Sequence, residues 1–225
     1  MKKTILDDGF QAYLTEGATF VGAPGIPMLM DLHNAQIPKD LLPFGKARAC
    51  KNKRQYVHFF QHDKCFSSVL TATTRHLDTL KQYDGVITPD CSILIGQSPC
   101  LQQTNTYMNR AVGFYLQKQG VPIIPNIRWG DESTYDFCFL GVPKNGIVCI
   151  STHGCLKIKK LREVFKAGIP VMLEQLTPHT VIVHGFMPED VFGEYLNLAT
   201  FVRYPSEYER THKDERGGDP YGTGI

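Results

Sequence analysis

Two apolar runs in the second half of the chain most constrain its fold. Residues 121–127 and 146–150 are nearly continuous apolar stretches rich in β-branched side chains. This composition is typical of strands that are buried on both faces of a parallel sheet. Each run gives way directly to polar residues, the first to Arg128 and the second to Ser151. Because ligands of α/β proteins bind beyond the carboxyl ends of the strands, these positions predict where a functional site lies.

The rest of the chain repeats the order of strand, polar strand end and helix. Short β-branched or aromatic runs predict the strands, and apolar residues at helical spacing predict the helices between them. The predicted strands are 56–62, 86–90, 121–127, 146–150, 180–183 and 200–203, and the predicted helices are 68–82, 102–119, 131–140, 156–167 and 189–196. We expect Gly168 to end the fourth of these helices, with a separate helical turn at residues 172–176. The connections are long enough for parallel pairing of successive strands.

This order predicts an α/β fold with a mostly parallel sheet. With one more short strand near residues 26–30, the number of strands approaches the eight of a (β/α) barrel, which favours a small or imperfect barrel of this kind. An open doubly wound sheet is the alternative. The length suits a single α/β domain over residues 1–205. Residues 206–225 are charged and rich in glycine, and we expect them to form a flexible tail.

Composition excludes several classes of function. The net charge of +2 and the isoelectric point of about 8.1 are too small to indicate a nucleic-acid or membrane partner by electrostatics alone. The sequence contains no apolar run that could span a bilayer and no signal-peptide core, which predicts a cytoplasmic protein without a membrane partner. Seven cysteines without a CxxC pair indicate reduced thiols. The motifs of dinucleotide, P-loop, α/β-hydrolase and HExxH zinc enzymes are missing, and no cofactor is indicated.

Polar residues collect at the predicted strand ends. Because the carboxyl ends of parallel strands meet at one edge, we expect these residues to share a site, although each alone also fits a structural role. The set is Asp63, Asp90, Asn126, Arg128, Asp131, Ser151, His153, His184 and Arg203. A metal site built from His58, His62, Asp63, His153 or His184 is a third possibility, although no close pair has a helical ligand spacing and the pair His58 and His62 has no evident third ligand. Trp129 is expected to pack in the core, with Arg128 facing the ligand.

Several segments together resemble a known family. They read YVHFFQHD, YDGVITPDCSIL, VPIIPNIRWGDESTYDFCFLGVPKNGIVCISTHGC, FKAGI and PHTVIVHG. In this order they resemble the phage and mobile-element proteins described as domain of unknown function 4417, over about residues 40–205. The resemblance implies an origin in a phage or mobile element, and a role in countering host defence or in phage nucleic-acid metabolism. In layout alone, the chain is similar to the (β/α)-barrel transglycosylases that exchange bases in tRNA or DNA.

Two functions follow from these residues as hypotheses. The first is an enzyme of nucleotide or nucleic-acid metabolism that acts on a glycosidic bond or exchanges a base. In that enzyme Asp90 and Asp131 supply the nucleophile or the acid–base chemistry, Arg128 and His153 hold phosphate, and Asn126 contacts the base or ribose. Ser151, His184 and Arg203 complete the predicted substrate contacts.

The second hypothesis is a binding protein without turnover. It would sequester a nucleotide signal or block a host protein, and it would use Arg128, His153 and Arg203 to bind an anion. The carboxylates would matter little in that case. Neither hypothesis indicates an oligomeric state.

Overall fold

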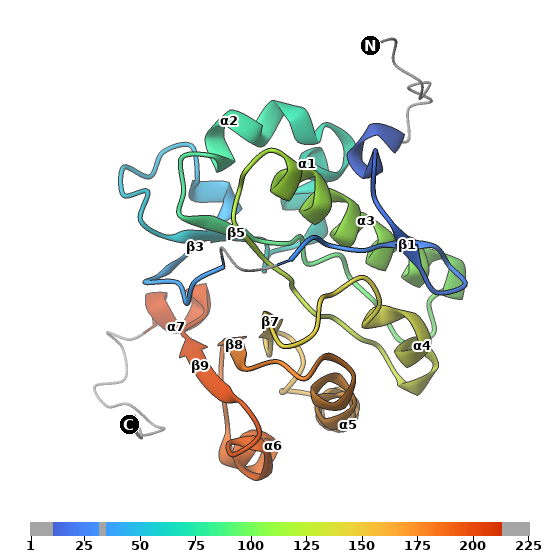
Figure 1. The fold of residues 1–225 in the computed structure, drawn as a ribbon. Coiled ribbons are helices and arrows are strands. Elements are labelled where there is room, and N and C mark those ends of the chain that lie inside the picture. The colour runs from blue at the N-terminus through green and yellow to red at the C-terminus, as the bar shows by residue number, and fades with distance from the viewer. Residues whose placement is uncertain (1–10, 32–34, 213–225) are drawn as a thin grey trace.

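The computed structural model describes residues 11–31 and 35–212 (Figure 1). In these ranges the strands form one antiparallel pair and two parallel sheets. The antiparallel pair is β1 (Phe20–Val21) and β2 (Ile26–Pro27); the first parallel sheet is β3 (Leu41–Pro43), β4 (Tyr56–His58), β5 (Gly85–Ile87) and β6 (Ile123–Ile124); the second is β7 (Ile147–Ser151), β8 (Thr180–His184) and β9 (Thr200–Tyr204). Within each parallel sheet, neighbours in the chain are neighbours in space.

A short parallel bridge joins the two parallel sheets. The amide of Ile127 donates to the carbonyl of Cys149 at 2.7 Å, and the amide of Cys149 donates to the carbonyl of Pro125 at 2.8 Å. The seven parallel strands therefore follow one another in chain order from β3 to β9. This confirms the predicted α/β fold with a mostly parallel sheet.

The described strands do not close into a barrel. Within residues 11–31 and 35–212, β3 is hydrogen-bonded as a strand only to β4, and β9 only to β8. A side-chain contact links the two edges instead, because the Tyr204 hydroxyl donates to the Pro38 carbonyl. The arrangement is consistent with the open-sheet alternative.

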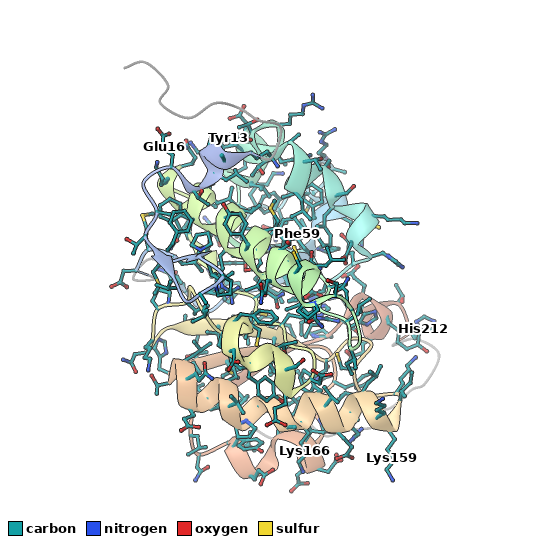
Figure 2. The ribbon with its side chains drawn as sticks, turned by 90° about the vertical axis from the view of Figure 1, so that its right-hand side faces the viewer. Tyr13, Glu16, Phe59, Lys159, Lys166 and His212 are labelled. Carbon is teal, nitrogen blue, oxygen red and sulfur yellow. The ribbon has the colours of Figure 1, made fainter. Side chains whose placement is uncertain are left out.

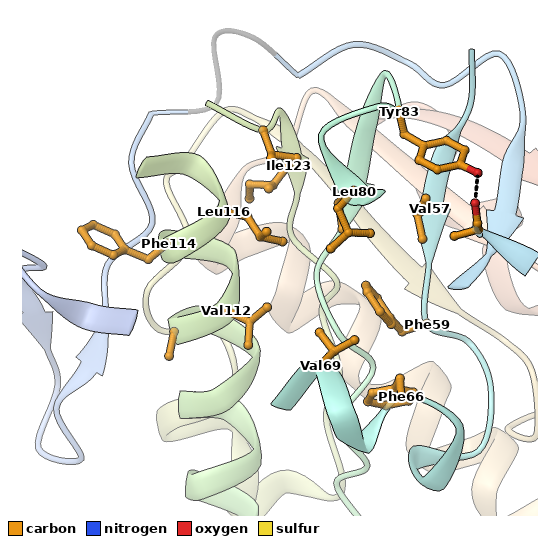
Figure 3. Packing of buried hydrophobic residues seen from close by; sticks show 14 of the residues in the cluster. Val57, Phe59, Phe66, Val69, Leu80, Tyr83, Val112, Phe114, Leu116 and Ile123 are labelled. Carbon is orange, nitrogen blue, oxygen red and sulfur yellow. Dashed lines mark hydrogen bonds between the residues drawn. The ribbon is translucent and has the colours of Figure 1, made fainter. Parts of the chain in front are cut away.

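One buried cluster takes a side chain from each parallel strand. Side chains alternate between the two faces of a strand, so those on the inward faces meet one another. The cluster contains Leu41, Tyr56, Phe60, Ile87, Ile124, Ile147, Cys149, Ile182 and Tyr204. The outward faces pack against the helices, where Val57 of β4 and the adjoining Phe59 belong to the same buried cluster as Val112 of α3 (Figure 3). The carboxyl ends of both sheets therefore border a single interior.

Helices fill the connections between strands. They are α1 (Ser67–Thr71) and α2 (Leu77–Leu80) before β5, α3 (Pro99–Lys118) before β6, α4 (Tyr135–Cys138) before β7, α5 (Lys159–Leu176) before β8, α6 (Glu189–Phe192) before β9, and α7 (Glu207–Thr211) after it. Short 3-10 turns accompany them at η1 (Ala12–Thr15), η2 (Phe44–Lys46), η3 (Asp63–Cys65), η4 (Thr73–His76), η5 (Glu132–Thr134) and η6 (Gly193–Tyr195). Figure 2 shows α3 and α5 as the longest of them, with Lys159 and Lys166 on the outer side of α5. No helix in the described ranges combines the length and the apolar character needed to cross a bilayer.

The helix after β7 is longer than predicted. Gly168 was expected to end it, but α5 continues through Gly168 and Pro170 to Leu176. The apolar residues of its second half, Ile169, Met172, Leu173 and Leu176, continue the helical spacing and are buried against the second sheet. This burial extends over two further turns. It outweighs the local destabilisation of the helix by glycine and proline.

Both ends of the chain also depart from the prediction. The strand expected near residues 26–30 pairs antiparallel with β1 and adds nothing to the parallel sheets, whereas β3 lies in a segment that the sequence did not mark as a strand.

The expected tail begins with a helix, because Ser206 and Glu209 form a capping box for α7 and Arg210 pairs with Asp40 at 2.5 Å. Residues 213–225, the rest of that predicted tail, lie outside the described residues.

Candidate functional site

Asp90 is the centre of a polar cluster at the strand ends. It lies three residues beyond β5, and both of its carboxylate oxygens are occupied. Asn126 donates from Nδ2 to Oδ1 at 2.8 Å, and Arg128 donates from Nη1 to Oδ2 at 3.2 Å. The Arg128 side chain is 24% exposed and that of Asp90 is 11% exposed, so the ion pair lies at the solvent side of the cluster. The structure thus brings together three of the predicted site residues.

Arg128 and Trp129 point in opposite directions, as predicted. The Asp90 carboxylate raises the pKa of Arg128 and keeps the guanidinium charged. The Trp129 ring is buried among the helices and stacks on Phe165 with centroids 5.1 Å apart. The expectation that the ring packs in the core is confirmed.

A buried network beneath Asp90 fixes the main chain of Asn126. The amide of Asn126 donates to the Thr88 hydroxyl at 2.8 Å. Its carbonyl accepts from Asn109 Nδ2 and from Arg110 Nη1, both at 3.2 Å. Asn109 also donates to the carbonyl of Pro89, at 2.6 Å. Helix α3 therefore holds the ends of β5 and β6 together from outside the sheet.

Arg110 is a site residue that the sequence reasoning missed. Its side chain is 1% exposed, and it donates to the carbonyls of Leu140, Cys138 and Asn126 and to the side chain of Asn109. Burial lowers its pKa to about 10. A signal existed, because buried polar or small residues recur along one face of α3. They are Gln102, Thr106, Asn109 and Gly113.

The second half of the cluster is aromatic and lies between β4 and β8. The rings of His58 and His184 are 4.8 Å apart, and Phe60 stacks on His184 at 4.4 Å. Burial lowers the pKa of His58 well below its usual value and that of His184 to about 3, so both rings are neutral. Ser151 Oγ lies 3.1 Å from His184 Nδ1. Two predicted residues, Ser151 and His184, therefore meet here.

The two halves adjoin at Cys155. Its thiol lies 3.9 Å from the carbonyl of Ser151, and the charges of Arg128 and Asp90 both act on it. Each half contains one fully buried polar atom without a hydrogen-bond partner in the described part of the chain. These atoms are Asn126 Oδ1 and His184 Nε2.

The other predicted residues serve different contacts. Asp131 caps η5 by accepting from the amide of Ser133 at 3.2 Å, and no hydrogen bond or ion pair joins it to Asp90 within the described residues. Asp63 accepts from the Ser92 hydroxyl at 2.9 Å. The exposed Arg203 donates to the Gly185 carbonyl at 3.0 Å.

His153 lies beside the cluster. Its side chain is exposed, and its amide donates to Ser151 Oγ at 3.2 Å. After burial, which is the main cause, the proximity of His153 further lowers the pKa of His184. Across the residues that the structure describes, no group of three or more His, Cys, Asp or Glu side chains is placed to hold a metal ion.

Comparison with known proteins shows the family and phage relatives. Residues 18–205 match the family model described as Domain of unknown function (DUF4417). The chain is 30% identical over 157 residues to the Gene 1 protein of Mycobacterium phage L5, covering 70% of this chain and 67% of that protein. It is 29% identical over 157 residues to the Gene 1 protein of Mycobacterium phage D29, covering 70% of this chain and 57% of that protein. No solved structure matches the chain. With most of its length matched by the family model, the chain belongs to the DUF4417 family.

Proposed function

We propose that the protein binds a nucleotide, free or within a nucleic acid, at the strand-end cluster. The observation that carries this proposal is the Asp90–Arg128 ion pair, which lies at the solvent side of a polar layer with unpartnered buried atoms. Buried polar atoms without a partner lower stability, so the two in this cluster, Asn126 Oδ1 and His184 Nε2, support the proposal that a ligand satisfies them. The position matches the place where α/β folds bind ligands.

Arg128 is the group best placed to take the anionic part of the ligand. A guanidinium has five N–H donors, and in the described residues Arg128 uses only Nη1, on Asp90. The remaining donors can form the paired hydrogen bonds that suit phosphate. The exposed His153 ring is available as a second contact at the same edge.

The geometry supports binding more directly than glycosidic-bond chemistry. That chemistry uses two carboxylates on either side of the reacting sugar carbon. Asp131 is instead committed to capping η5, and both oxygens of Asp90 already accept hydrogen bonds. We therefore propose a binding protein that sequesters a nucleotide signal or blocks a host protein in the cytoplasm of the host cell.

An enzyme of nucleotide or nucleic-acid metabolism is the second candidate. The observation in its favour is that Arg128 shields only Oδ2 of Asp90 and that this contact is long for a charge-assisted bond, at 3.2 Å. A phosphate that drew Arg128 away would free a carboxylate oxygen beside the ligand. Asp90 would then act as nucleophile or base without help from Asp131.

Titration calorimetry with a panel of nucleotides tests the proposal. We expect Arg128→Gln to weaken binding at least tenfold, because it removes the charge that contacts phosphate. The matched control is Arg162→Gln, which breaks the ion pair with Asp190 on α5 and α6 and should leave binding unchanged. Equal affinities for the parent and Arg128→Gln would refute the proposed site.

Recovery of the ligand separates binding from catalysis. Protein incubated with cell nucleotides is washed and denatured, and the released compound is identified by mass spectrometry. An unaltered ligand at one per chain supports the binding protein. A converted compound that disappears in Asp90→Asn supports the enzyme.

A further inference from the structure

An exposed surface of aromatic and basic side chains adjoins the strand-end cluster. Two of its rings belong to Phe186, which follows β8 and is 38% exposed, and to Tyr208 of α7, which is 42% exposed. Lys157, in the loop after β7, places its Nζ 5.2 Å from the centre of the Tyr208 ring, and His212 stacks on the same ring with centroids 4.1 Å apart. These four residues, together with Lys159 and Lys160, form what we call the aromatic–basic surface.

Arg203 holds the two sides of this surface together. Its guanidinium lies 5.9 Å from the centre of the Phe186 ring, and its Nε donates to the carbonyl of Gly185 at 3.0 Å. The same guanidinium pairs with Glu209 of α7. The loop after β8 is therefore fixed to the helix that carries Tyr208, and the rings of Phe186 and Tyr208 belong to one continuous surface.

The aromatic–basic surface begins where the strand-end cluster ends. Phe186 lies two residues beyond His184, and Lys157 lies two residues beyond Cys155. Nδ1 of His184 is 3.1 Å from the hydroxyl of Ser151, and the Cys155 thiol is 3.9 Å from the Ser151 carbonyl. A ligand longer than one nucleotide can therefore extend from the cluster onto this surface.

The lysines of the aromatic–basic surface are not neutralised by the protein. Lys157, Lys159 and Lys160 are exposed, and none of them forms an ion pair with a carboxylate of the described residues. The first turn of α5 has no acidic residue, whereas both glutamates of α7 are already paired with basic side chains. Figure 2 shows Lys159 at the same end of the molecule as His212. The surface therefore offers three cationic side chains to an anion.

We propose that the aromatic–basic surface binds single-stranded nucleic acid. Bases of the strand stack on Phe186 and Tyr208, and its phosphates contact the three lysines. Rings beside cations are the combination by which proteins hold a chain of unpaired bases. A duplex does not offer this fit, because its bases already stack on one another. The proposal rests on the proposed function, since one nucleotide of the strand occupies the site at Arg128 and its neighbours lie on the surface.

A base that stacks on Tyr208 displaces only a weak contact. Nζ of Lys157 lies over the ring, and a cation–π contact at an exposed position is weaker than base stacking. The ammonium group ends a flexible four-carbon chain, so it can move from the ring to a phosphate. Lys157 therefore exchanges the ring for a phosphate when a strand binds.

Fluorescence anisotropy with a labelled oligonucleotide of about 12 nucleotides tests the proposal, a length within the site sizes of single-strand binding folds. DNA and RNA of one sequence are both measured, because bases and phosphates are common to them. Either single strand should bind at least about tenfold more tightly than adenosine 5′-monophosphate, measured by competition, and than the duplex of the same sequence. A duplex that binds as tightly as the single strand would overturn the proposal.

Two substitutions at Tyr208 separate stacking from folding. Tyr208→Ala should weaken single-strand binding at least about fivefold, since one stacked base is lost, whereas Tyr208→Phe keeps the ring and should bind like the parent. The control Phe20→Ala removes a 51% exposed ring from β1, on the opposite side of the molecule from α7 (Figure 1), and should leave binding unchanged. Full binding by Tyr208→Ala would contradict the stacking, and so would an equal loss in Tyr208→Phe.

The dependence of affinity on salt tests the lysines. Each phosphate contact to a single strand contributes about 0.7 to the slope of log affinity against log salt concentration, so loss of all three lysines should make the slope shallower by about 2. The triple variant is Lys157→Gln, Lys159→Gln and Lys160→Gln. Its control replaces exposed lysines that precede β4, β5 and β7, at the opposite ends of the strands: Lys51→Gln, Lys81→Gln and Lys144→Gln. Equal slopes for these two proteins would refute the phosphate contacts.

Mononucleotide binding distinguishes failure of this proposal from failure of the proposed function. If adenosine 5′-monophosphate binds and the single strand binds no more tightly, the protein takes free nucleotides and the aromatic–basic surface is not part of the site. If neither binds, the proposed function fails as well. Polyglutamate that displaces the oligonucleotide at an equal concentration of charge would show a surface for acidic protein chains, and would also overturn the proposal.

Discussion

Replacing Trp129 tests how the second sheet and α5 are packed. The ring is only 8% exposed and stacks on Phe165. A buried tryptophan removes on the order of 200 Å² from water, which is worth about 5 kcal/mol at 25 cal/mol per Å², as an upper value. Trp129→Ala should therefore lower the free energy of unfolding by about 4 kcal/mol, within the range of large-to-small core substitutions.

Gly168 makes the prediction sharper. A Cβ at this position would lie 2.2 Å from Nε1 of Trp129 and 2.5 and 2.6 Å from two further ring atoms. Gly168→Ala should cost about 1–3 kcal/mol in the parent through overpacking. In the Trp129→Ala background the obstacle is gone, and alanine should stabilise the helix by about 1 kcal/mol. The two substitutions should thus be coupled by about 2–4 kcal/mol.

Urea denaturation followed by far-ultraviolet circular dichroism measures this coupling. Fluorescence is unsuitable, because Trp129 is the sole tryptophan of the chain. The midpoint should shift while the slope stays constant, which indicates a change in stability alone. If Gly168→Ala destabilised the parent and the Trp129→Ala protein equally, the packing of the Trp129 ring would not require a glycine at position 168. A loss below about 1 kcal/mol for Trp129→Ala would show that the ring is not part of the core.

Three further predictions concern His184, Arg110 and Arg210. Burial lowers the pKa of His184 to about 3, so near pH 6.5 the unfolded chain takes up a proton that the folded protein excludes. The contribution of the neutral ring to the free energy of unfolding should therefore be complete above pH 6.5 and decline as the pH falls towards 3. His184→Phe should flatten this slope in urea titrations between pH 7 and 5, and an unchanged slope would contradict it. Arg110→Met should cost at least about 3 kcal/mol in the same assay, since two buried carbonyls and one part-buried carbonyl lose a donor. Arg210→Gln should cost less than about 1 kcal/mol, because its ion pair with Asp40 is partly exposed; a larger loss would make α7 a structural element of the core.

The order of parallel strands could be predicted from the sequence because each strand is a short apolar run. Residues 146–150 and 180–183 are buried on both faces, so the run is continuous and stands out from its surroundings. β3 has the same character over only three residues, Leu41–Pro43, and lies before a basic segment. Its pairing with β4, and not its local composition, makes it a strand.

Half of the site could be predicted for a similar reason. Asp90, Asn126 and Arg128 follow strands whose ends are adjacent in the sheet, so their order in the chain already brings them together. Asp131 follows the same strand but lies beyond Gly130, where the chain turns into η5 and needs a cap. The choice between a cap and a site residue depends on where the turn falls, and a single sequence does not specify that.

The residues missed by the sequence reasoning are those that break its rules. A core helix face is expected to be apolar, yet α3 buries Asn109 and Arg110 against the ends of β5 and β6. A buried guanidinium whose hydrogen bonds go to neutral acceptors gains less than one paired with a carboxylate. Departures from local rules of this kind concentrate where a protein functions. This network positions Asn126 beneath the Asp90–Arg128 pair, so the polar face of α3 and the unpartnered amide oxygen point independently to the same edge of the sheet.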